Sequence, residues 1–178
     1  MQRIIVIGPS GAGKSTLARE LHRLTSIPLV HLDHEFWHPH WQETNRDEWR
    51  RVQENMVAGS TWIIDGTYGS TLEIRLRAAD TVVFLDFPRR ICLWRAVTRW
   101  ARYRGTPRPD MGEGCPEKMD REFLRWIWRW NKDERPQVMD KLDGVSMGTQ
   151  VVRIHTPRQA VRFLRSVEAA QENAGPER

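Results

Sequence analysis

A glycine-rich stretch near the start of the chain has residue types and a spacing that suit phosphate binding. Residues 4–17 read IIVIGPSGAGKSTL, and the pattern G-x-x-x-x-G-K-[ST] is satisfied by Gly8, Gly13, Lys14 and Ser15. Apolar residues before the loop suit a buried strand and those after it suit the start of a helix, which is the context that the motif requires. The alternative is a plain glycine-rich turn between a strand and a helix.

The chemistry of phosphate explains these residue types. Glycines let an anion approach the backbone, so N–H groups at a helix N-terminus can converge on phosphate oxygens. Lys14 would supply a cation for the β- and γ-phosphates, and the Ser15 hydroxyl is a hard oxygen ligand for Mg²⁺. The predicted nucleoside-triphosphate site consists of Gly8, Pro9, Ser10, Gly11, Ala12, Gly13, Lys14, Ser15 and Thr16.

Three aspartates follow apolar runs that suit buried strands. Asp33 ends the run 29–33, where it could orient or deprotonate a substrate hydroxyl, or simply end the strand. Asp65 ends the run 61–66 and could hold Mg²⁺ through a water, or form an Asp-Gly turn. Asp86, at the end of the run 81–86, is expected to be structural and to cap the next helix.

Arginines recur on one face of a predicted helix that runs from Pro88 to about Tyr103. Arg95, Arg99 and Arg102 are spaced to lie along that face. Guanidinium groups suit bidentate contacts to a triphosphate, so we predict that Arg95 and Arg99 close over it; a solvated charged face is the alternative. A second set of arginines follows the predicted lid, and one of them is expected to take part in the site: Arg121, Arg125 and Arg129.

Aromatic residues and histidines crowd the segment after Asp33. Trp37 and Trp41 are predicted to form walls of a substrate pocket, with capping of the core as the alternative. A metal site made of His34, His38 and His40 is not favoured, because their spacing matches no specific site.

The alternation of apolar runs with helical patterns predicts an α/β fold. Strands are expected at 4–7, 29–33, 61–66, 81–86 and 150–154, with helices between them. They would form a five-stranded parallel sheet flanked by helices, with ligands at the carboxyl ends of the strands. Glycines and prolines between 105 and 116 indicate a helical lid insertion. We expect one domain over residues 1–170, with a substrate-binding segment at about 34–60, a lid at about 100–130 and a frayed tail at 171–178.

Composition narrows the class of protein. The 178 residues are 39% hydrophobic and 29% charged, as in a soluble globular domain, and the net charge of +5 favours an anionic partner that nucleotide phosphates alone could provide. The two cysteines suggest neither a disulfide framework nor a zinc site. The sequence shows no signal peptide or membrane span, so we expect a cytoplasmic protein without a membrane partner. It makes no prediction of oligomeric state.

To about residue 130 the chain resembles small P-loop kinases of the adenylate-kinase and gluconate/shikimate-kinase superfamily. It is more closely similar to the bacterial DNA topology modulation protein (FlaR-like) group. The closer resemblance rests on GPSGAGKST (8–16), LDHEFWHP (32–39), WIIDGTYGSTLEIRLRAAD (62–80), VVFLDFPRRICLWR (82–95) and RPDMGEGCPEKMDREFLRWIW (108–128). It implies a P-loop kinase fold with ATP and Mg²⁺ as cofactors.

The resemblance also implies roles for single residues. Asp33 falls where sugar-acid and shikimate kinases keep a substrate-binding aspartate, and Asp65 matches the aspartate that ends strand three in adenylate kinases. Arg95 and Arg99 match lid-helix arginines that contact adenine and phosphates. The arginine that reads a nucleoside monophosphate in adenylate kinases is missing from its place in 66–69, and Arg75 is the candidate to substitute for it.

These observations favour an ATP- and Mg²⁺-dependent phosphotransferase acting on a small hydroxylated or phosphorylated acceptor. The expected catalytic residues are Lys14, Asp33, Arg95 and Arg99, the substrate-binding residues are Asp33, Trp37, Asp65 and Arg75, and the metal ligands are Ser15 and Asp65. A nucleotide-regulated DNA-binding protein that uses segment 94–130 is a weaker alternative, because no helix-turn-helix or finger signature supports it. A bare NTPase switch is the third.

Overall fold

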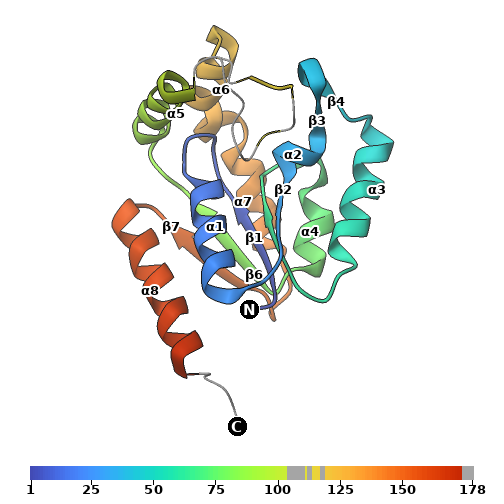
Figure 1. The fold of residues 1–178 in the computed structure, drawn as a ribbon, viewed down its shortest axis with the longest axis vertical. Helices are drawn as coiled ribbons and strands as arrows, with labels where there is room; N and C mark the ends of the chain where they lie inside the picture. Colours follow the sequence, from blue (N-terminus) through green and yellow to red (C-terminus); the bar gives the residue numbers. More distant parts are fainter. Residues whose placement is uncertain (104–110, 112–113, 117–118, 174–178) are drawn as a thin grey trace.

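A five-stranded parallel sheet forms the centre of the protein (Figure 1). The structure is a computed structural model, and it describes residues 1–103, 111, 114–116 and 119–173. In spatial order the strands are β2 (Leu29–His31), β5 (Trp62–Asp65), β1 (Arg3–Ile7), β6 (Thr81–Leu85) and β7 (Gln150–Ile154). The predicted α/β class and parallel sheet are confirmed, and four of the five strands lie within one residue of their expected bounds.

The central strand β1 contributes side chains to two hydrophobic clusters, one on each face of the sheet. Side chains alternate between the faces of a strand, and in β1 all of Ile4 to Ile7 are fully buried. Ile4 and Val6 pack into one hydrophobic cluster, whereas Ile5 and Ile7 pack into the other. A continuous apolar run is therefore what a parallel strand covered on both faces requires.

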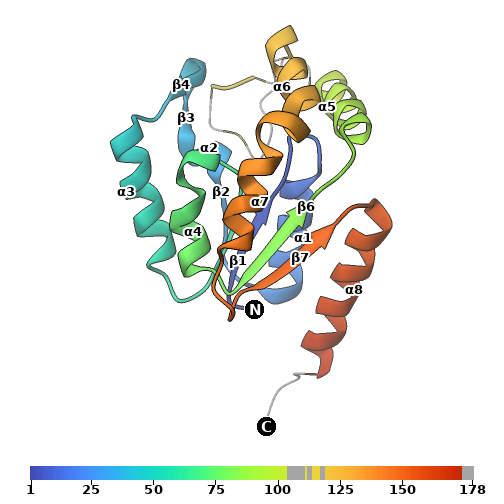
Figure 2. The same cartoon turned by 180° about the vertical axis from the view of Figure 1, so that it is seen from behind.

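Helices cover both faces of the sheet (Figure 2). The face of Ile4 and Val6 is covered by α1 (Lys14–Thr25) and α8 (Pro157–Asn173). The face of Ile5 and Ile7 is covered by α3 (Arg46–Val57), α4 (Leu72–Ala78) and α7 (Arg135–Asp143). Helix α8 continues to Asn173, which is further than the expected start of a frayed tail at 171. No helix among the described residues combines the length and the apolar character needed to cross a membrane.

Two further helices lie above the carboxyl edge of the sheet, where α5 (Arg89–Tyr103) packs beside α6 (Arg121–Asp133). Helix α6 begins at Arg121, because the Asp120 side chain accepts a 2.7 Å hydrogen bond from the Phe123 N–H and caps the helix. The region between the two helices, which holds most of the predicted glycine- and proline-rich lid, falls largely outside the described residues.

The segment after β2 differs from its prediction. We expected a strand to Asp33 and then a loop, but β2 ends at His31 and is followed by α2 (Leu32–Phe36), β3 (Trp37–His38), η1 (Pro39–Trp41) and β4 (Gln42–Glu43). Strands β3 and β4 form a two-residue antiparallel pair. The Phe36 carbonyl accepts hydrogen bonds from the Thr44 N–H and hydroxyl, at 3.0 and 2.8 Å, which closes this hairpin. Asp33 therefore lies in a helical turn rather than at a strand end.

Candidate active site at the carboxyl edge of the sheet

The predicted phosphate-binding loop connects β1 to α1, and its glycines are required by geometry. Gly8, Gly11 and Gly13 have φ values of 145°, 80° and 94°, which other residues rarely adopt. A Cβ atom on Gly8 would lie 2.5 Å from the Leu85 carbonyl oxygen, and one on Gly11 would collide with the Cys92 carbonyl. The loop is therefore packed tightly against the end of β6 and the start of α5, with its amides at the positive end of α1.

A cavity of about 730 Å³ lies over this loop, and we call it the loop cavity. Its other walls come from α5 and the first half of α8. Lys14 belongs to its lining and folds back over the loop, where its Nζ donates a 3.3 Å hydrogen bond to the Pro9 carbonyl. The charged side chains among its described lining residues are five cations and two carboxylates: Lys14, Arg19, Arg95, Arg99, Arg102, Glu20 and Asp33. The loop cavity therefore suits a polyanion.

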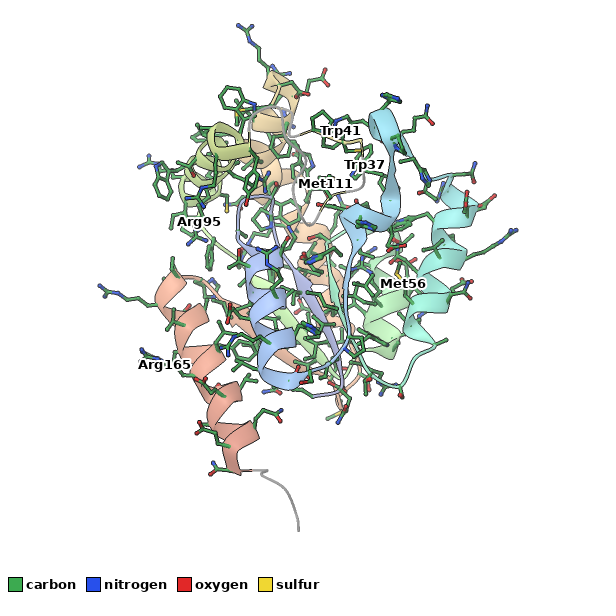
Figure 3. All side chains as sticks on the ribbon, in the orientation of Figure 1. Trp37, Trp41, Met56, Arg95, Met111 and Arg165 are labelled. Atoms are coloured by element: carbon green, nitrogen blue, oxygen red, sulfur yellow. The ribbon has the colours of Figure 1, made fainter. Side chains whose placement is uncertain are left out.

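The arginines of α5 reach the loop cavity as the sequence predicts. Arg95 lies between α5 and the start of α1 (Figure 3). Its guanidinium donates a 3.0 Å hydrogen bond to the Ala12 carbonyl and lies 5.3 Å from the centre of the Phe87 ring. Arg95 therefore also holds the phosphate-binding loop in shape. The second arginine set does not reach either cavity described here, and Arg129 instead pairs with Asp133 at 2.6 Å.

A second cavity of about 770 Å³ adjoins the first, and we call it the aromatic cavity. The predicted wall residues Trp37 and Trp41 line it, with their ring centres 5.3 Å apart (Figure 3). The opposite wall comes from α6 and includes the side chains of Phe123, Trp126 and Trp130. Four residues line both cavities: Ser10, Lys14, Asp33 and Arg99. Three of the four predicted catalytic residues therefore lie where the two cavities meet.

A tyrosine that the sequence analysis did not single out orients the shared aspartate. The Tyr68 hydroxyl donates a 2.8 Å hydrogen bond to Asp33 Oδ1. Burial, together with the charge of Asp33 and this hydrogen bond, raises the pKa of Tyr68 well above its usual range. The phenol therefore stays protonated and acts as a permanent donor. Asp33 Oδ2 has no hydrogen-bond partner among the described residues, which leaves this oxygen for a ligand.

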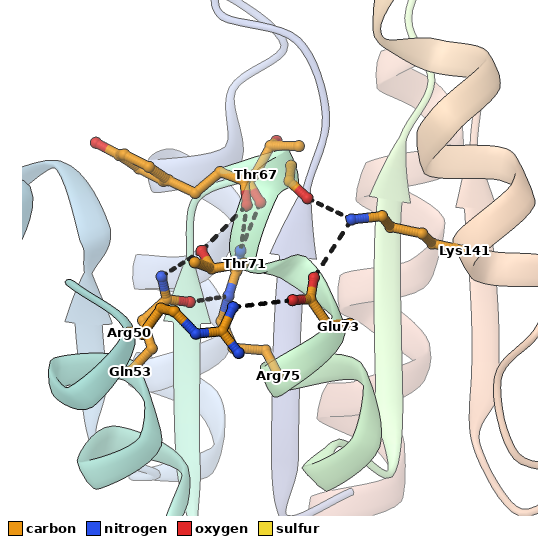
Figure 4. Close-up of polar contacts among 9 residues, drawn as sticks. Arg50, Gln53, Thr67, Thr71, Glu73, Arg75 and Lys141 are labelled. Atoms are coloured by element: carbon orange, nitrogen blue, oxygen red, sulfur yellow. Dashed lines mark hydrogen bonds and ion pairs between the residues drawn. The ribbon is translucent and has the colours of Figure 1, made fainter. Parts of the chain in front are cut away.

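The loop that carries Tyr68 is held by Arg75, not by a substrate. Arg75 is fully buried, and its guanidinium donates to three consecutive carbonyls, those of Gly66, Thr67 and Tyr68 (Figure 4). Its Nε donates to Gln53 Oε1 at 2.7 Å. Burial lowers the pKa of Arg75 to about 9, so the side chain remains charged at neutral pH. The predicted contact between Arg75 and an acceptor has no counterpart in this geometry, because the donors of Arg75 face the backbone of the loop.

The hydrogen bonds from Arg75 to the carbonyls of residues 66–68, which we call the arginine clamp, explain an unusual backbone conformation. Tyr68 has φ 38°, in the left-handed region that residues with a side chain rarely adopt. Preceding it, the Thr67 hydroxyl accepts a hydrogen bond from the Gly8 N–H at 3.0 Å and donates one to the Gly8 carbonyl at 2.8 Å. The residues 66–68 therefore connect the phosphate-binding loop with the partner of Asp33. No spacing rule in the sequence points to Thr67 or Tyr68.

Asp65 is nearly buried, with 5% of its side chain exposed, and its Oδ2 pairs with His31 Nδ1 at 2.8 Å. Asp65 is not part of the described lining of either cavity, so the structure does not bring it to the place predicted for an acceptor. Its Oδ1 is buried without a hydrogen-bond partner among the described residues. Asp65 pairs in register with Val6, two residues before the phosphate-binding loop begins. Its carboxylate oxygen and the Ser15 hydroxyl are both hard oxygen donors of the kind that Mg²⁺ prefers.

Asp86 has a different structural role from the one predicted. We expected it to cap the helix after β6. Instead both of its oxygens accept hydrogen bonds from Arg135, at 2.8 and 2.7 Å, and His155 Nδ1 lies 3.6 Å away. The carboxylate therefore ties the end of β6 to α7 and to the end of β7.

Comparisons with solved structures identify the fold. A shikimate kinase from Acinetobacter baumannii in complex with shikimate is 16% identical, has a TM-score of 0.59, and matches over 99% of this chain and 96% of that chain. A shikimate kinase from Bacteroides thetaiotaomicron is also 16% identical, with a TM-score of 0.57 over 96% and 98% of the two chains. An unliganded sugar kinase from Janibacter is 17% identical, with a TM-score of 0.51 over 93% of each.

The chain is thus a P-loop α/β protein with the fold of small-molecule kinases. A scan against family models finds no match, and a search of curated proteins finds no significant match. At these identities the likeness concerns the fold alone, so the function has to be argued from the two cavities.

Proposed function

We propose that the protein is an ATP- and Mg²⁺-dependent phosphotransferase. It transfers the γ-phosphoryl group of ATP from the loop cavity to a hydroxyl group of a small molecule in the aromatic cavity. The observation that carries this proposal is that the two cavities share Lys14, Asp33 and Arg99. A nucleotide-binding protein without an acceptor has no need of a second cavity that opens on the same aspartate.

Each shared residue has a chemical task in this transfer. The new bond joins the acceptor oxygen to the γ-phosphorus, and the bond between that phosphorus and the β–γ bridging oxygen breaks. Lys14 and Arg99 stabilise the charge on the transferring group. The hydroxyl proton passes to Asp33 Oδ2, while Tyr68 holds Oδ1 and fixes the orientation of the carboxylate.

The donor is held mainly by the phosphate-binding loop. Residues 8–16 supply backbone N–H groups for its phosphates, and Arg95 stabilises the loop through the Ala12 carbonyl. We assign the metal to Ser15 and, through a water, to Asp65 Oδ1, whose burial without a described partner supports this role. When bound, Mg²⁺ would neutralise phosphate charge as the γ-phosphoryl group leaves.

The division of the chain follows from the same proposal. Residues 1–170 form the kinase domain, with 34–60 as the substrate-binding segment and about 100–130 as the lid. A location in the cytoplasm, where ATP is abundant, and membership of the FlaR-like group belong to the same proposal.

Phosphoryl transfer from [γ-³²P]ATP to a panel of acceptors tests the proposed function. The panel contains nucleosides, nucleoside monophosphates, sugars, sugar acids and amino sugars, and labelled product is separated from phosphate. Acceptor-dependent label in the product is expected. ATP hydrolysis at the same rate with every acceptor and with none would contradict the proposal and would favour an NTPase switch.

A nucleic-acid-binding surface is a second candidate, and two observations favour it. Trp94 is 67% exposed on α5, and Arg89 stacks over Trp128 of α6 with its guanidinium carbon 3.8 Å from the ring centre. Exposed aromatic and arginine side chains suit unpaired bases. Binding of single-stranded and duplex DNA at two salt concentrations tests this candidate, which predicts affinity that falls steeply with salt.

A further inference from the structure

The aromatic cavity carries a charge that points to the class of its occupant. Among its described lining residues, five are carboxylates and two are cations: Asp33, Glu43, Asp120, Glu122, Glu134, Lys14 and Arg99. Both cations also line the loop cavity, so they lie at the junction. Away from the junction, the described charged side chains of the aromatic cavity are all acidic.

Three of these five carboxylates make no ion pair within the described part of the chain. Glu43, Glu122 and Glu134 form no ion pair with any other residue that the structure describes, although the chain as a whole has a net charge of +5. Glu134 is the N-cap residue of α7, but its side chain makes no capping hydrogen bond. Its Oε2 lies 3.6 Å from the place that a Cβ atom on Gly69 would occupy. Acidic groups that lie unpaired around a cavity attract a cationic ligand and repel an anionic one.

The walls between the carboxylates also suit a cation. Trp126 stacks on Phe123 with ring centres 6.2 Å apart and meets Trp130 edge-on at 5.5 Å. With Trp37 and Trp41 opposite, aromatic side chains line both sides of the cavity. Aromatic faces attract ammonium groups through their quadrupole. The Trp130 indole N–H is buried without a hydrogen-bond partner among the described residues and suits an acceptor hydroxyl oxygen.

In the described part of the chain, a further arginine beside this cavity, Arg75, does not face a ligand. Arg75 is fully buried behind the loop 66–68, and its donors bind backbone carbonyls. An acceptor carboxylate or phosphate would therefore meet Lys14 and Arg99, which are needed for the donor, and would face carboxylates elsewhere.

We propose that the phosphoryl acceptor is a hydroxylated amine, such as an amino sugar, whose ammonium group lies among Glu43, Glu122 and Glu134 while a hydroxyl group faces Asp33. This inference rests on the proposed phosphotransferase function and specifies its substrate class. It excludes acceptors that carry a carboxylate or a phosphate.

Three six-carbon acceptors that differ in charge test the inference: glucosamine, glucose and gluconate. Transfer from [γ-³²P]ATP is measured at equal acceptor concentrations, and binding is followed by tryptophan fluorescence, since four tryptophans line the cavity. We expect glucosamine to be phosphorylated and bound in preference to glucose, and gluconate to give neither signal.

Variants that replace a glutamate by glutamine measure how much the charge of that carboxylate contributes to acceptor binding. Glu122→Gln and Glu134→Gln should each raise the KM for glucosamine about two- to fivefold, as for an accessible ion pair, with little change in kcat. The KM for glucose should not change. Glu54→Gln is the matched control, because Glu54 is an exposed carboxylate of α3 outside both cavities, and it should leave both KM values unchanged.

The outcomes distinguish a failure of this inference from a failure of the proposed phosphotransferase function. Transfer to gluconate or to a nucleoside monophosphate, but not to glucosamine, would overturn the inference and leave the phosphotransferase intact. Equal changes in KM for glucosamine and for glucose in the two glutamate variants would also overturn the inference and leave the phosphotransferase intact. Transfer to none of the acceptors by a protein that binds ATP would contradict the phosphotransferase itself, and the inference with it.

Discussion

The loop cavity and the aromatic cavity share a wall but have opposite charge. The described lining of the loop cavity has five cations and two carboxylates, whereas that of the aromatic cavity has two cations and five carboxylates. The difference indicates that each cavity selects a different reactant, a polyanion on one side and a neutral or cationic molecule on the other. The net charge of +5 conceals this contrast because it averages over both.

The largest effect is expected from changing the aspartate at the junction. Asp33→Asn keeps the size of the side chain and removes its ability to take a proton, so kcat for acceptor phosphorylation should fall about 10²- to 10⁴-fold. ATP affinity, measured by equilibrium titration, should be nearly unchanged. Normal turnover in this variant would remove Asp33 from the transfer and with it the main link between the two cavities.

The next effect concerns the cation at the same junction. Lys14→Ala should lower kcat about 10²- to 10³-fold, because it removes a donor that stabilises charge in the transferring group. Unlike Asp33→Asn, it should also weaken ATP binding. Arg19→Ala, at an exposed position of the loop cavity, should have a much smaller effect on kcat and provides a comparison within the same cavity.

The third prediction concerns stability. Arg75→Met leaves the carbonyls of residues 66–68 without their buried donors, so the free energy of unfolding should fall by about 3 kcal/mol or more. Arg77→Met is the matched control, since Arg77 is exposed on the same helix and should change stability by less than about 0.5 kcal/mol. Urea unfolding followed by circular dichroism measures both. Equal stability of the two variants would contradict the clamp.

The fourth prediction concerns the tyrosine that positions the aspartate. Tyr68→Phe removes one hydrogen bond to Asp33, so kcat/KM for the acceptor should fall roughly five- to tenfold while the KM for ATP stays constant. A change in the KM for ATP as large as the change for the acceptor would show that Tyr68 serves both cavities equally.

A pH titration adds an independent readout on Tyr68. Its pKa is raised in the folded protein, so above pH 10 the unfolded chain releases a proton that the folded protein retains. The stability of the wild type should therefore decrease as the pH rises above 10, by up to about 1.4 kcal/mol per pH unit from this group. The phenylalanine variant should lack this component.

The smallest effect is expected from salt. Raising the ionic strength screens accessible charges, so the KM values for ATP and for glucosamine should both rise a few-fold between about 0.05 and 0.5 M salt. The KM for glucose should stay constant. A KM for glucosamine that falls with salt would show that the aromatic cavity repels cations.

The sequence predicts those parts of the site that depend on local spacing. The phosphate-binding loop, the arginines at 95 and 99 and the apolar strands follow from neighbouring residues and from helix or strand periodicity. The pairs Tyr68–Asp33 and His31–Asp65 join residues 35 and 34 positions apart, and no local pattern encodes them.

The departures from prediction have a common physical origin. Arg75 is predicted to substitute for the arginine missing from 66–69, but the buried carbonyls of its own loop take up its donors. The strand predicted to reach Asp33 ends at His31, because residues 32–36 form α2, whose last carbonyl accepts from the Thr44 hydroxyl. In both cases backbone carbonyls within about nine residues along the chain decide the outcome.

The two hydrogen bonds between Thr67 and Gly8 have a consequence for the order of events in turnover. A shift of Gly8 as phosphate enters would be passed through Thr67 to Tyr68, and from there to Asp33. The affinities for the two reactants are therefore expected to be coupled. By thermodynamic reciprocity, each should change the dissociation constant of the other by the same factor.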